Sequence, residues 1–364
     1  MRIAILGTRG VPPAYGGFET FAGEISTRLA RRGHDVTVYC RKSLYRGEPS
    51  IWHGVRRVEL SAVRHKYFET VSHTFLSALH VLRAGTDVAL VCNAANAFAL
   101  PILRVARIPV AINVDGIERT RRKWNAAGRF VYLAGEALSA EFADALIADA
   151  AVIGAYYLTN FGRRPVMIPY GSQFSTASDT DILKKLGIEP RRYLLYVSRF
   201  EPENNPLEVL RSFLDARLDV PLVMVGDAPY AMDLVRQVHA QSTSNVILPG
   251  AIYGPDYETL QRNALLYIQA TEVGGTHPAM IEAMASGGAV LANDTPENRE
   301  VGGDTVQYFD VREAASLKTF LRRSIDAPAM LDVYRSKARN RAHQLYDWER
   351  VTDEYERLFR RLAR

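Results

Sequence analysis

The chain of 364 residues contains only two cysteines and no long apolar run. Cys40 and Cys92 both end segments that we predict to be buried strands, and two thiols supply no disulfide framework. No apolar stretch approaches the roughly 20 residues that a membrane-spanning helix requires. Residues 2–6 (RIAIL) already have the pattern of a buried strand with no basic leader before them, so we expect no signal peptide. We therefore expect a cytoplasmic protein, with peripheral contact to the inner face of the cell membrane left open.

The motifs of common nucleotide and metal sites are also missing. Residues 7–17 (GTRGVPPAYGG) follow the first predicted strand but lack the G-x-G-x-x-G spacing of a dinucleotide-binding turn. Cys40 and Arg41 stand where that fold has an acid, which argues against NAD and NADP. No Gly-Lys-Ser/Thr follows, which excludes a Walker A loop. The D-x-D at 179–181 lies in a polar linker rather than after a strand, so we expect a solvated loop or helix cap and no metal site.

What remains is a soluble, mildly basic chain with room for two domains. Hydrophobic residues make up 48% and charged residues 23% of the sequence, as in ordinary globular proteins. A chain of this length is too long for one ordinary core. The net charge of +5 suits an acidic partner, which leaves a nucleotide, an anionic lipid head group and nucleic acid as candidates.

Short apolar runs alternate with helical patterns in both halves of the chain. Because these runs are continuously apolar, they predict strands covered on both faces and hence parallel sheets. The predicted fold class is α/β, with two facing Rossmann-like, doubly wound domains at residues 1–171 and 172–345. Residues 171–180 form the predicted linker. The amphipathic segment 346–364 either closes the second domain or crosses back to the first. The predicted strands are 3–6, 36–39, 55–60, 88–92, 110–114, 145–148, 166–168, 193–198, 222–226, 246–248, 265–269, 289–292 and 306–309.

The long glycine-rich loop after the first strand delivers Gly16 and Gly17 to the start of a helix. Amide groups at a helix N-terminus favour an anion. The alternative is a simple strand-to-helix connection in which glycine serves only the turn. Because the loop is well above the two to six residues typical of such connections, we favour a binding role.

The segment 272–287 (EVGGTHPAMIEAMASG) indicates a second anion site. We expect the amides of Gly275, Thr276 and His277 to begin a helix and to cradle a diphosphate. Glu282 lies one turn further on, where a carboxylate can accept hydrogen bonds from ribose hydroxyls. Arg199 follows another predicted strand, and we expect it to stabilise charge on a departing diphosphate.

These segments together resemble the retaining glycosyltransferases of the GT-B fold, family 4, and within it the rhamnosyltransferase-like branch of bacterial polysaccharide assembly. The resemblance implies a nucleotide-sugar donor on the second domain and an acceptor on the first. It assigns Arg199 to the diphosphate, Thr276 and His277 to the diphosphate and sugar, and Glu282 to the ribose. It also implies that Gly16 and Gly17 close over the donor phosphates. The matching segments are GTRGVPPAYGGFET (7–20), NVDGIERTRRKW (113–124), IADA (147–150), IPYGS (168–172), VSRFEPENNP (197–206) and GGTHPAMIEAMASGG (274–288).

The chain departs from the wider family at several positions that the resemblance assigns to ligands. The family's glutamate eight positions before Glu282 is Gly274 here, and its lysine after the phosphate-binding arginine is Asn204, which we keep as a donor-binding candidate. A frequent histidine is replaced by Asp115, and a usual asparagine by Tyr170. We take Asp115, Glu118, Asp149 and Tyr170 as candidates for acceptor and sugar contacts, with a helix cap or loop hydrogen bond as the alternative for each.

Cations and aromatic side chains mix in the first domain between residues 119 and 132. We expect Arg121, Arg122, Lys123 and Trp124 to form an acceptor and membrane patch that contacts an anionic bilayer. The alternative is a solvated basic helix. The other members of this segment's cation and aromatic set are Arg119, Arg129, Phe130 and Tyr132.

The expected function is retaining transfer of a sugar, L-rhamnose from dTDP-L-rhamnose, in cell-surface polysaccharide assembly. The acceptor would be a glycan or a polyprenyl-diphosphate-linked sugar, and the reaction would need neither metal nor cofactor besides the donor. A nucleotide-sugar 2-epimerase of similar fold is one alternative. A non-enzymatic, basic nucleic-acid-binding protein is another, and the diphosphate cradle at 274–288 argues against it.

Overall fold

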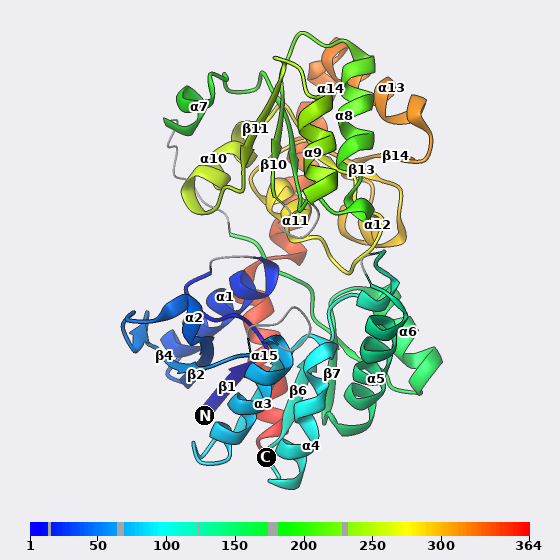
Figure 1. Cartoon of the computed structure of the whole chain (residues 1–364). Coiled ribbons are helices and arrows are strands. Elements are labelled where there is room, and N and C mark those ends of the chain that lie inside the picture. The colour runs from blue at the N-terminus through cyan, green and yellow to red at the C-terminus, as the bar shows by residue number, and fades with distance from the viewer. Residues whose placement is uncertain (14–15, 64–68, 123, 174–180, 228–231) are drawn as a thin grey trace. The chain divides into compact units, whose positions relative to one another are not determined.

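The computed structural model describes residues 1–13, 16–63, 69–122, 124–173, 181–227 and 232–364 (Figure 1). The chain divides into two compact units. Unit 1 comprises Met1–Tyr170 together with Trp348–Arg364, and unit 2 comprises Gly171–Asp347. Each unit is a sheet of mainly parallel strands covered by helices, so the predicted α/β fold class is confirmed.

Unit 1 contains an eight-stranded sheet in the order β3-β4-β2-β1-β5-β6-β7-β8. The short pair β3–β4 is antiparallel, and the other described pairs are parallel. The strand order reverses between β1 and β5, which makes their carboxyl ends the switch point where ligands of such sheets bind. The strands are β1 (Arg2–Leu6), β2 (Asp35–Arg41), β3 (Ile51–Trp52), β4 (Val55–Leu60), β5 (Val88–Cys92), β6 (Val110–Asn113), β7 (Ala145–Ala148) and β8 (Val166–Met167).

Helices cover both faces of this sheet. Right-handed crossovers place the helices that connect β4 through β7 on one face and the helix after β1 on the other. The helical elements of unit 1 are α1 (Gly17–Arg31), α2 (Lys42–Tyr45), α3 (Glu69–Val81), η1 (Ala94–Ala99), α4 (Leu100–Val105), η2 (Glu118–Thr120), α5 (Ala126–Phe142), α6 (Ala151–Phe161) and α15 (Trp348–Leu362).

The last helix, α15, belongs to unit 1 although 177 residues of unit 2 precede it in the chain. It packs on α1, and its buried stripe includes Trp348, Tyr355 and Phe359. The ring of Phe21 in α1 lies 5.2 Å from the ring of Tyr355 and 6.3 Å from that of Trp348. Burial of these rings stabilises the contact, since each large aromatic side chain removes 150–250 Å² from water.

Unit 2 contains a six-stranded parallel sheet in the order β11-β10-β9-β12-β13-β14. This is the strand order of the doubly wound dinucleotide-binding fold, and it reverses between β9 and β12. The strands are β9 (Leu194–Val197), β10 (Leu222–Val225), β11 (Val246–Gly250), β12 (Leu266–Gln269), β13 (Val290–Asn293) and β14 (Gln307–Phe309). The side chains of β9, β10, β12 and β13 are almost all buried, as expected for strands covered on both faces, whereas the edge strand β11 is mostly half-buried.

The helices of unit 2 pack apolar stripes against this sheet. In α8, Leu207, Leu210 and Phe213 are buried in the core with Leu194 and Met224 of the neighbouring strands. The helical elements are α7 (Asp181–Leu186), η3 (Pro202–Asn204), α8 (Pro206–Ala216), α9 (Met232–Gln241), α10 (Gly254–Asn263), α11 (Pro278–Ala285), α12 (Pro296–Gly302), α13 (Ala314–Asp326) and α14 (Pro328–Leu345).

Each strand predicted from apolar runs corresponds to a strand in the structure. β3 was not predicted, because two residues at a sheet edge leave no apolar run. Asp181 of the D-x-D begins α7, whereas residues 179 and 180 lie outside the described part of the chain. Among the described residues, no helix combines the length and apolar character needed to cross a bilayer.

The returning helix gives a stability prediction for unit 1. Phe359 is fully buried beside Tyr355, so Phe359→Ala should lower the free energy of unfolding by about 3–5 kcal/mol through lost contacts and a cavity. Hydrogen exchange of the β1 and β6 amides during urea titration reports unit 1 alone. Arg357→Ala, on the exposed face of the same helix, should change stability by less than about 0.5 kcal/mol. Equal protection in both variants would show that unit 1 does not depend on α15.

Candidate functional site

Two loops of unit 2 meet at the carboxyl edge of its sheet, after the neighbouring strands β9 and β12. The amide of Glu272 donates to the carbonyl oxygen of Glu203 at 2.9 Å. The side-chain amide of Asn205 donates to the carbonyl of Ala270 at 2.8 Å. These bonds hold the loop after β9 against the loop after β12. The two segments that we predicted to bind an anion therefore lie side by side at the switch point of the sheet.

The loop after β12 leads directly into α11. Pro278 occupies the first turn, His277 is the N-cap residue, and Gly275 and Thr276 are buried just before it. The first amides of a helix have no intrahelical acceptor, and the helix dipole adds positive potential at that end. This end of α11 therefore has the geometry and electrostatics of an anion cradle.

Gly274 makes room for the imidazole of His277. A Cβ at position 274 would come within 2.7 Å of Cε1 of His277, closer than carbon atoms approach without a shift. The histidine ring thus fills the space that a side chain at 274 would need. A glutamate at position 274, where the resemblance expects one, would therefore collide with the His277 ring as it lies here.

Glu282 of α11 is held by a tyrosine that the sequence analysis did not identify. The hydroxyl of Tyr257 in α10 donates to Oε2 of Glu282 at 2.6 Å. Gln261 Nε2 donates to that hydroxyl at 2.5 Å and to the carbonyl of Ala279 at 3.1 Å. Burial and the Glu282 charge raise the pKa of Tyr257 well above its ordinary value, so the phenol keeps its proton and stays a donor. One carboxylate oxygen is thereby oriented by the protein.

Arg199 lies in the loop after β9 with its side chain 45% exposed and Nη1 3.4 Å from Glu201. The side chain of Asn204 is buried and donates to the carbonyl of Arg199 at 2.7 Å. Asn204 therefore closes the turn that carries Arg199, a role that the sequence analysis did not predict. Direct contact between Asn204 and a nucleotide-sugar donor stays a prediction.

In unit 1, carboxylates follow the neighbouring strands β6 and β7. Asn113 of β6 pairs with Ile147 of β7, so Asp115 and Asp149 both stand two residues beyond that pair. Burial, followed by the charges of Asp149 and Glu118, raises the pKa of Asp115 to about 7. At neutral pH this carboxyl can therefore donate or accept a hydrogen bond.

Glu118 and Arg121 form an ion pair beside this carboxylate pair. Nε of Arg121 donates to Oε1 of Glu118 at 2.6 Å, and the two side chains are only 12% and 11% exposed. The Arg121 charge acts to lower the pKa of Asp115. Arg121 thus lies next to the acidic cluster rather than on an open surface, where the sequence analysis had expected it. The spacing of three residues was visible in the sequence, but nothing there indicated burial.

The last helix fixes the end of β6 that carries Asp115. The side-chain amide of Asn113 donates to the hydroxyl of Tyr355 in α15 at 2.8 Å, and its oxygen accepts from the Asp115 amide at 3.0 Å. Tyr170 is buried, with its ring 4.8 Å from that of Trp348 in the same helix. The ring of Tyr170 is therefore a packing group in unit 1.

Gly16 and Gly17 begin α1, as predicted, at the end of the loop that follows β1. The loop is braced by Glu19, whose buried carboxylate accepts from the Arg9 amide at 3.0 Å. At the start of the loop, Asn96 donates to the carbonyl of Gly7 at 3.1 Å. Glu19 lies within the quoted glycine-rich segment, so its role could have been predicted from the sequence. No feature of the sequence indicates that Asn96 contacts this loop.

The remaining members of the predicted membrane patch differ in exposure. Arg122 is exposed, and Trp124 is half-buried with its ring 5.0 Å from that of Tyr132. Lys123 lies outside the described residues.

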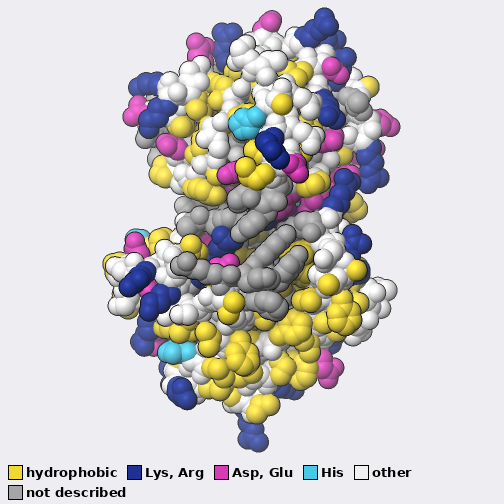
Figure 2. Space-filling model, in the orientation of Figure 1, with side chains coloured by type: hydrophobic (Ala, Val, Ile, Leu, Met, Phe, Trp, Pro, Cys, Tyr) yellow, Lys and Arg dark blue, Asp and Glu magenta, His cyan; other side chains and the backbone are white. Residues whose placement is uncertain are grey.

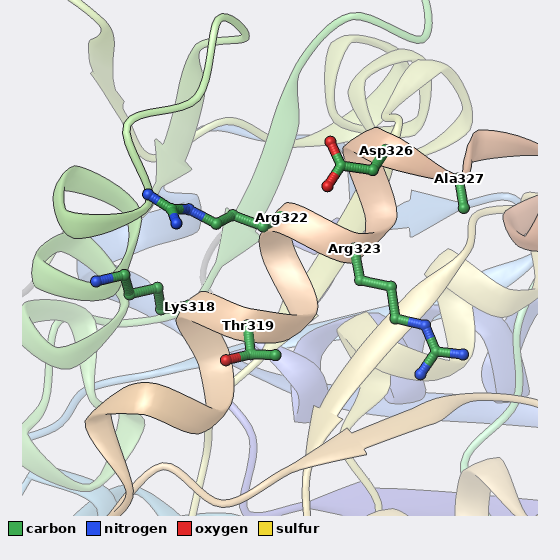
Figure 3. A pocket seen from close by; sticks show the side chains of 6 residues that line it. All are labelled: Lys318, Thr319, Arg322, Arg323, Asp326 and Ala327. Atoms are coloured by element: carbon green, nitrogen blue, oxygen red, sulfur yellow. The ribbon is translucent and has the colours of Figure 1, made fainter.

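A hollow of about 410 Å³ on α13 is not part of this site. It is lined by Lys318, Thr319, Arg322, Arg323, Asp326 and Ala327. Figure 3 shows the side chains of Lys318 and Arg322 pointing away from that of Arg323, so the three cations do not converge on one ligand.

Two protein-family models match most of this chain between them. Residues 16–171 match the glycosyl transferase 4-like domain, and residues 178–341 match the glycosyl transferases group 1. A phosphatidyl-myo-inositol mannosyltransferase of Mycolicibacterium smegmatis is 26% identical over 206 residues, which span 54% of this chain and 52% of that protein.

Solved structures show the same fold over the whole chain. Sucrose-phosphate synthase of Thermosynechococcus elongatus has a TM-score of 0.85 at 21% identity, covering 99% of this chain and 98% of that one. HepE of Anabaena, in complex with UDP-glucose, has a TM-score of 0.80 at 16% identity with full coverage of both chains. Because the two family matches together cover most of the sequence, the chain belongs to the glycosyltransferases of the GT-B fold.

Proposed function

We propose that this chain is a retaining glycosyltransferase that moves a sugar from a nucleoside diphosphate to a glycan or a polyprenyl-diphosphate-linked sugar. The observation that carries this proposal is the cradle formed where the loop after β12 enters α11, next to the loop that bears Arg199. The choice of L-rhamnose, from dTDP-L-rhamnose, rests on the resemblance of the quoted segments to the rhamnosyltransferase-like branch. The same resemblance supports a role in cell-surface polysaccharide assembly.

The donor would bind to unit 2. Its diphosphate would lie at the N-terminus of α11, and Glu282 would accept a hydrogen bond from a sugar hydroxyl of the nucleoside. Departure of the nucleoside diphosphate builds negative charge on its β-phosphate. Arg199 and the amides at the start of α11 would stabilise that charge, and such preorganised donors are a large part of catalysis. Because these groups supply the positive potential, the proposal requires no metal ion.

The acceptor would bind to unit 1. In a retaining transfer the acceptor hydroxyl attacks from the face that the leaving group vacates, and a leaving phosphate oxygen can take its proton. Asp115 and Asp149 would then orient the acceptor by hydrogen bonds to sugar hydroxyls. The pKa of about 7 for Asp115 fits this role, since both protonation states are accessible at neutral pH. Gly16 and Gly17 would contribute backbone amides to a phosphate.

The donor assignment can be tested by calorimetric titration of the full chain with dTDP-L-rhamnose, UDP-glucose and GDP-mannose. We expect tightest binding of the dTDP sugar, followed by transfer of radiolabelled rhamnose to lipid-linked N-acetylglucosamine. Nucleoside diphosphate should be released only when the acceptor is present, which separates transfer from 2-epimerisation. Binding of none of the sugar nucleotides would overturn the proposal, whereas preference for another would correct the sugar.

Arg199→Ala tests stabilisation of the leaving group. We expect kcat to fall by a factor of about 10²–10³, because one donor to the developing charge is lost. Binding of the nucleoside diphosphate should weaken much less. Arg211→Ala, an exposed position on α8, serves as the matched control and should leave turnover unchanged. Full turnover of the Arg199 variant would remove this arginine from the mechanism.

Tyr257→Phe tests whether an oriented Glu282 carboxylate binds the nucleoside. The variant loses the hydroxyl that donates to Oε2 of Glu282 but keeps the ring, so the fold should be retained. Loss of a hydrogen bond to a charged group predicts about tenfold weaker binding of dTDP by calorimetry. Tyr253→Phe, an exposed tyrosine just before α10, should bind dTDP as the unaltered chain does. Equal affinity in both variants would contradict the assignment of Glu282.

The carboxylate pair gives a pH prediction. The folded-state pKa of Asp115 is about 7 against an ordinary 3.8, so between about pH 4 and 7 folding takes up a proton and stability falls as the pH rises. Asp115→Asn should lack this slope in thermal melts. Asp149→Asn should lower the pKa of Asp115, measured by NMR of labelled aspartate, without restoring 3.8, because burial remains. Asp144→Asn, at the other end of β7, should leave it unchanged, and an unaltered pKa in Asp149→Asn would contradict the coupling.

A further inference from the structure

The helices on one face of unit 1 carry apolar side chains on their outer surface. In α3, Phe75, Leu76 and Leu79 are 47%, 39% and 39% exposed, while the opposite side of the helix is buried. A surface helix of a globular protein normally presents polar residues to water. The buried side of α3 carries His73, Thr74 and Ser77, so its large apolar side chains face outward and have a neighbour still to be accounted for.

This surface continues over the adjacent elements. η1 and α4 contact both α3 and α5, so the four form one layer on the sheet. Phe98 of η1 is 37% exposed, and Phe130 and Leu133 of α5 are 70% and 44% exposed. Figure 2 shows apolar side chains gathered over this part of unit 1. We call it the apolar face; its exposed members are Phe75, Leu76, Leu79, Leu82, Phe98, Val105, Phe130, Val131 and Leu133.

Within the segments that form the apolar face the charged side chains are of one sign, whereas Glu69 begins α3 and Asp144 pairs with Arg104 of α4. The segments 70–82, 94–105 and 126–135 contain no aspartate or glutamate. Arg83, Arg107 and Arg122 lie near the ends of these segments and Arg129 lies within one of them, and all four are exposed. An apolar centre bordered by cations is complementary to a bilayer whose head groups are anionic. The long arginine side chains can reach phosphates while their stems stay beside apolar groups.

We propose that the apolar face of unit 1 docks into the surface of an anionic lipid bilayer, with the side chains of α3, η1 and α5 among the acyl chains. This inference extends the proposed function, because a lipid-linked acceptor would be presented at such a surface. It also assigns the contact with lipid phosphates to a partly different set of arginines. Arg122 and Arg129 border the face, whereas Arg121 is paired with Glu118 beside the acidic cluster.

The test is co-sedimentation of the full chain with phosphatidylcholine vesicles, with and without phosphatidylglycerol. We expect binding to the anionic vesicles that persists in part at high salt, since apolar contacts are not screened. Leu79→Glu combined with Phe130→Glu should lower the bound fraction about tenfold or more, because two apolar side chains that would enter the bilayer are replaced by charges. Both positions are exposed, so the fold should tolerate the change.

Matched controls separate the outcomes. Val333→Glu, at an exposed apolar position of α14 in unit 2, should bind vesicles as the unaltered chain does. Arg122→Glu with Arg129→Glu should weaken binding only to anionic vesicles. Affinity for dTDP in unit 2 is measured separately, so failure of vesicle binding is distinguishable from failure of the proposed transferase activity. Undiminished sedimentation of the Leu79 and Phe130 variant would overturn the inference. A dimer in solution that this variant disperses would also overturn it, by assigning the face to a second copy.

Discussion

The hydrogen bond between Asn113 and Tyr355 is the contact on which the candidate site of unit 1 depends. It joins the carboxyl end of β6 to Tyr355 of α15, which stands 242 residues later in the chain. The same asparagine holds the amide of Asp115, so the position of that carboxyl is set by packing of α15. A contact of this kind links stability and function, because loosening the helix would also release the strand end that carries the acidic group.

In unit 2, hydrogen bonds between two loops hold the candidate site in place. The loops after β9 and β12 are tied through Glu203 and Ala270, and Asn204 closes the turn that presents Arg199. These bonds, one between backbone groups and two from asparagine side chains, hold the two loops in place before any anion binds. Preorganised groups need little rearrangement when charge develops, which is the physical basis of their effect on a reaction. The buried side chains of Asn204 and Asn205 thus hold the loop that carries Arg199.

Much of the fold followed from local sequence patterns, because continuous apolar runs and glycine-bounded helices are local features. Residues 3–6 and 193–198 were recognised as strands for that reason, and Pro278 marked the start of α11. The side-chain partners of the candidate site residues could not be predicted in this way. No sequence feature near Glu282 indicates that Tyr257 is its partner. Burial of Arg121 depends on how η2 packs against α5. Partners of this sort come from tertiary packing, which a single sequence without related sequences does not reveal.

The return of α15 to unit 1 has a consequence for biosynthesis. Chains emerge from the ribosome N-terminus first, and domains tend to fold as they appear. Unit 2 can complete its sheet while unit 1 still lacks α15, which is translated after unit 2. Until then the aromatic surface of Phe21 lacks its partners and is open to the wrong ones. Nascent chains should therefore need protection by chaperones until the closing segment has left the exit tunnel.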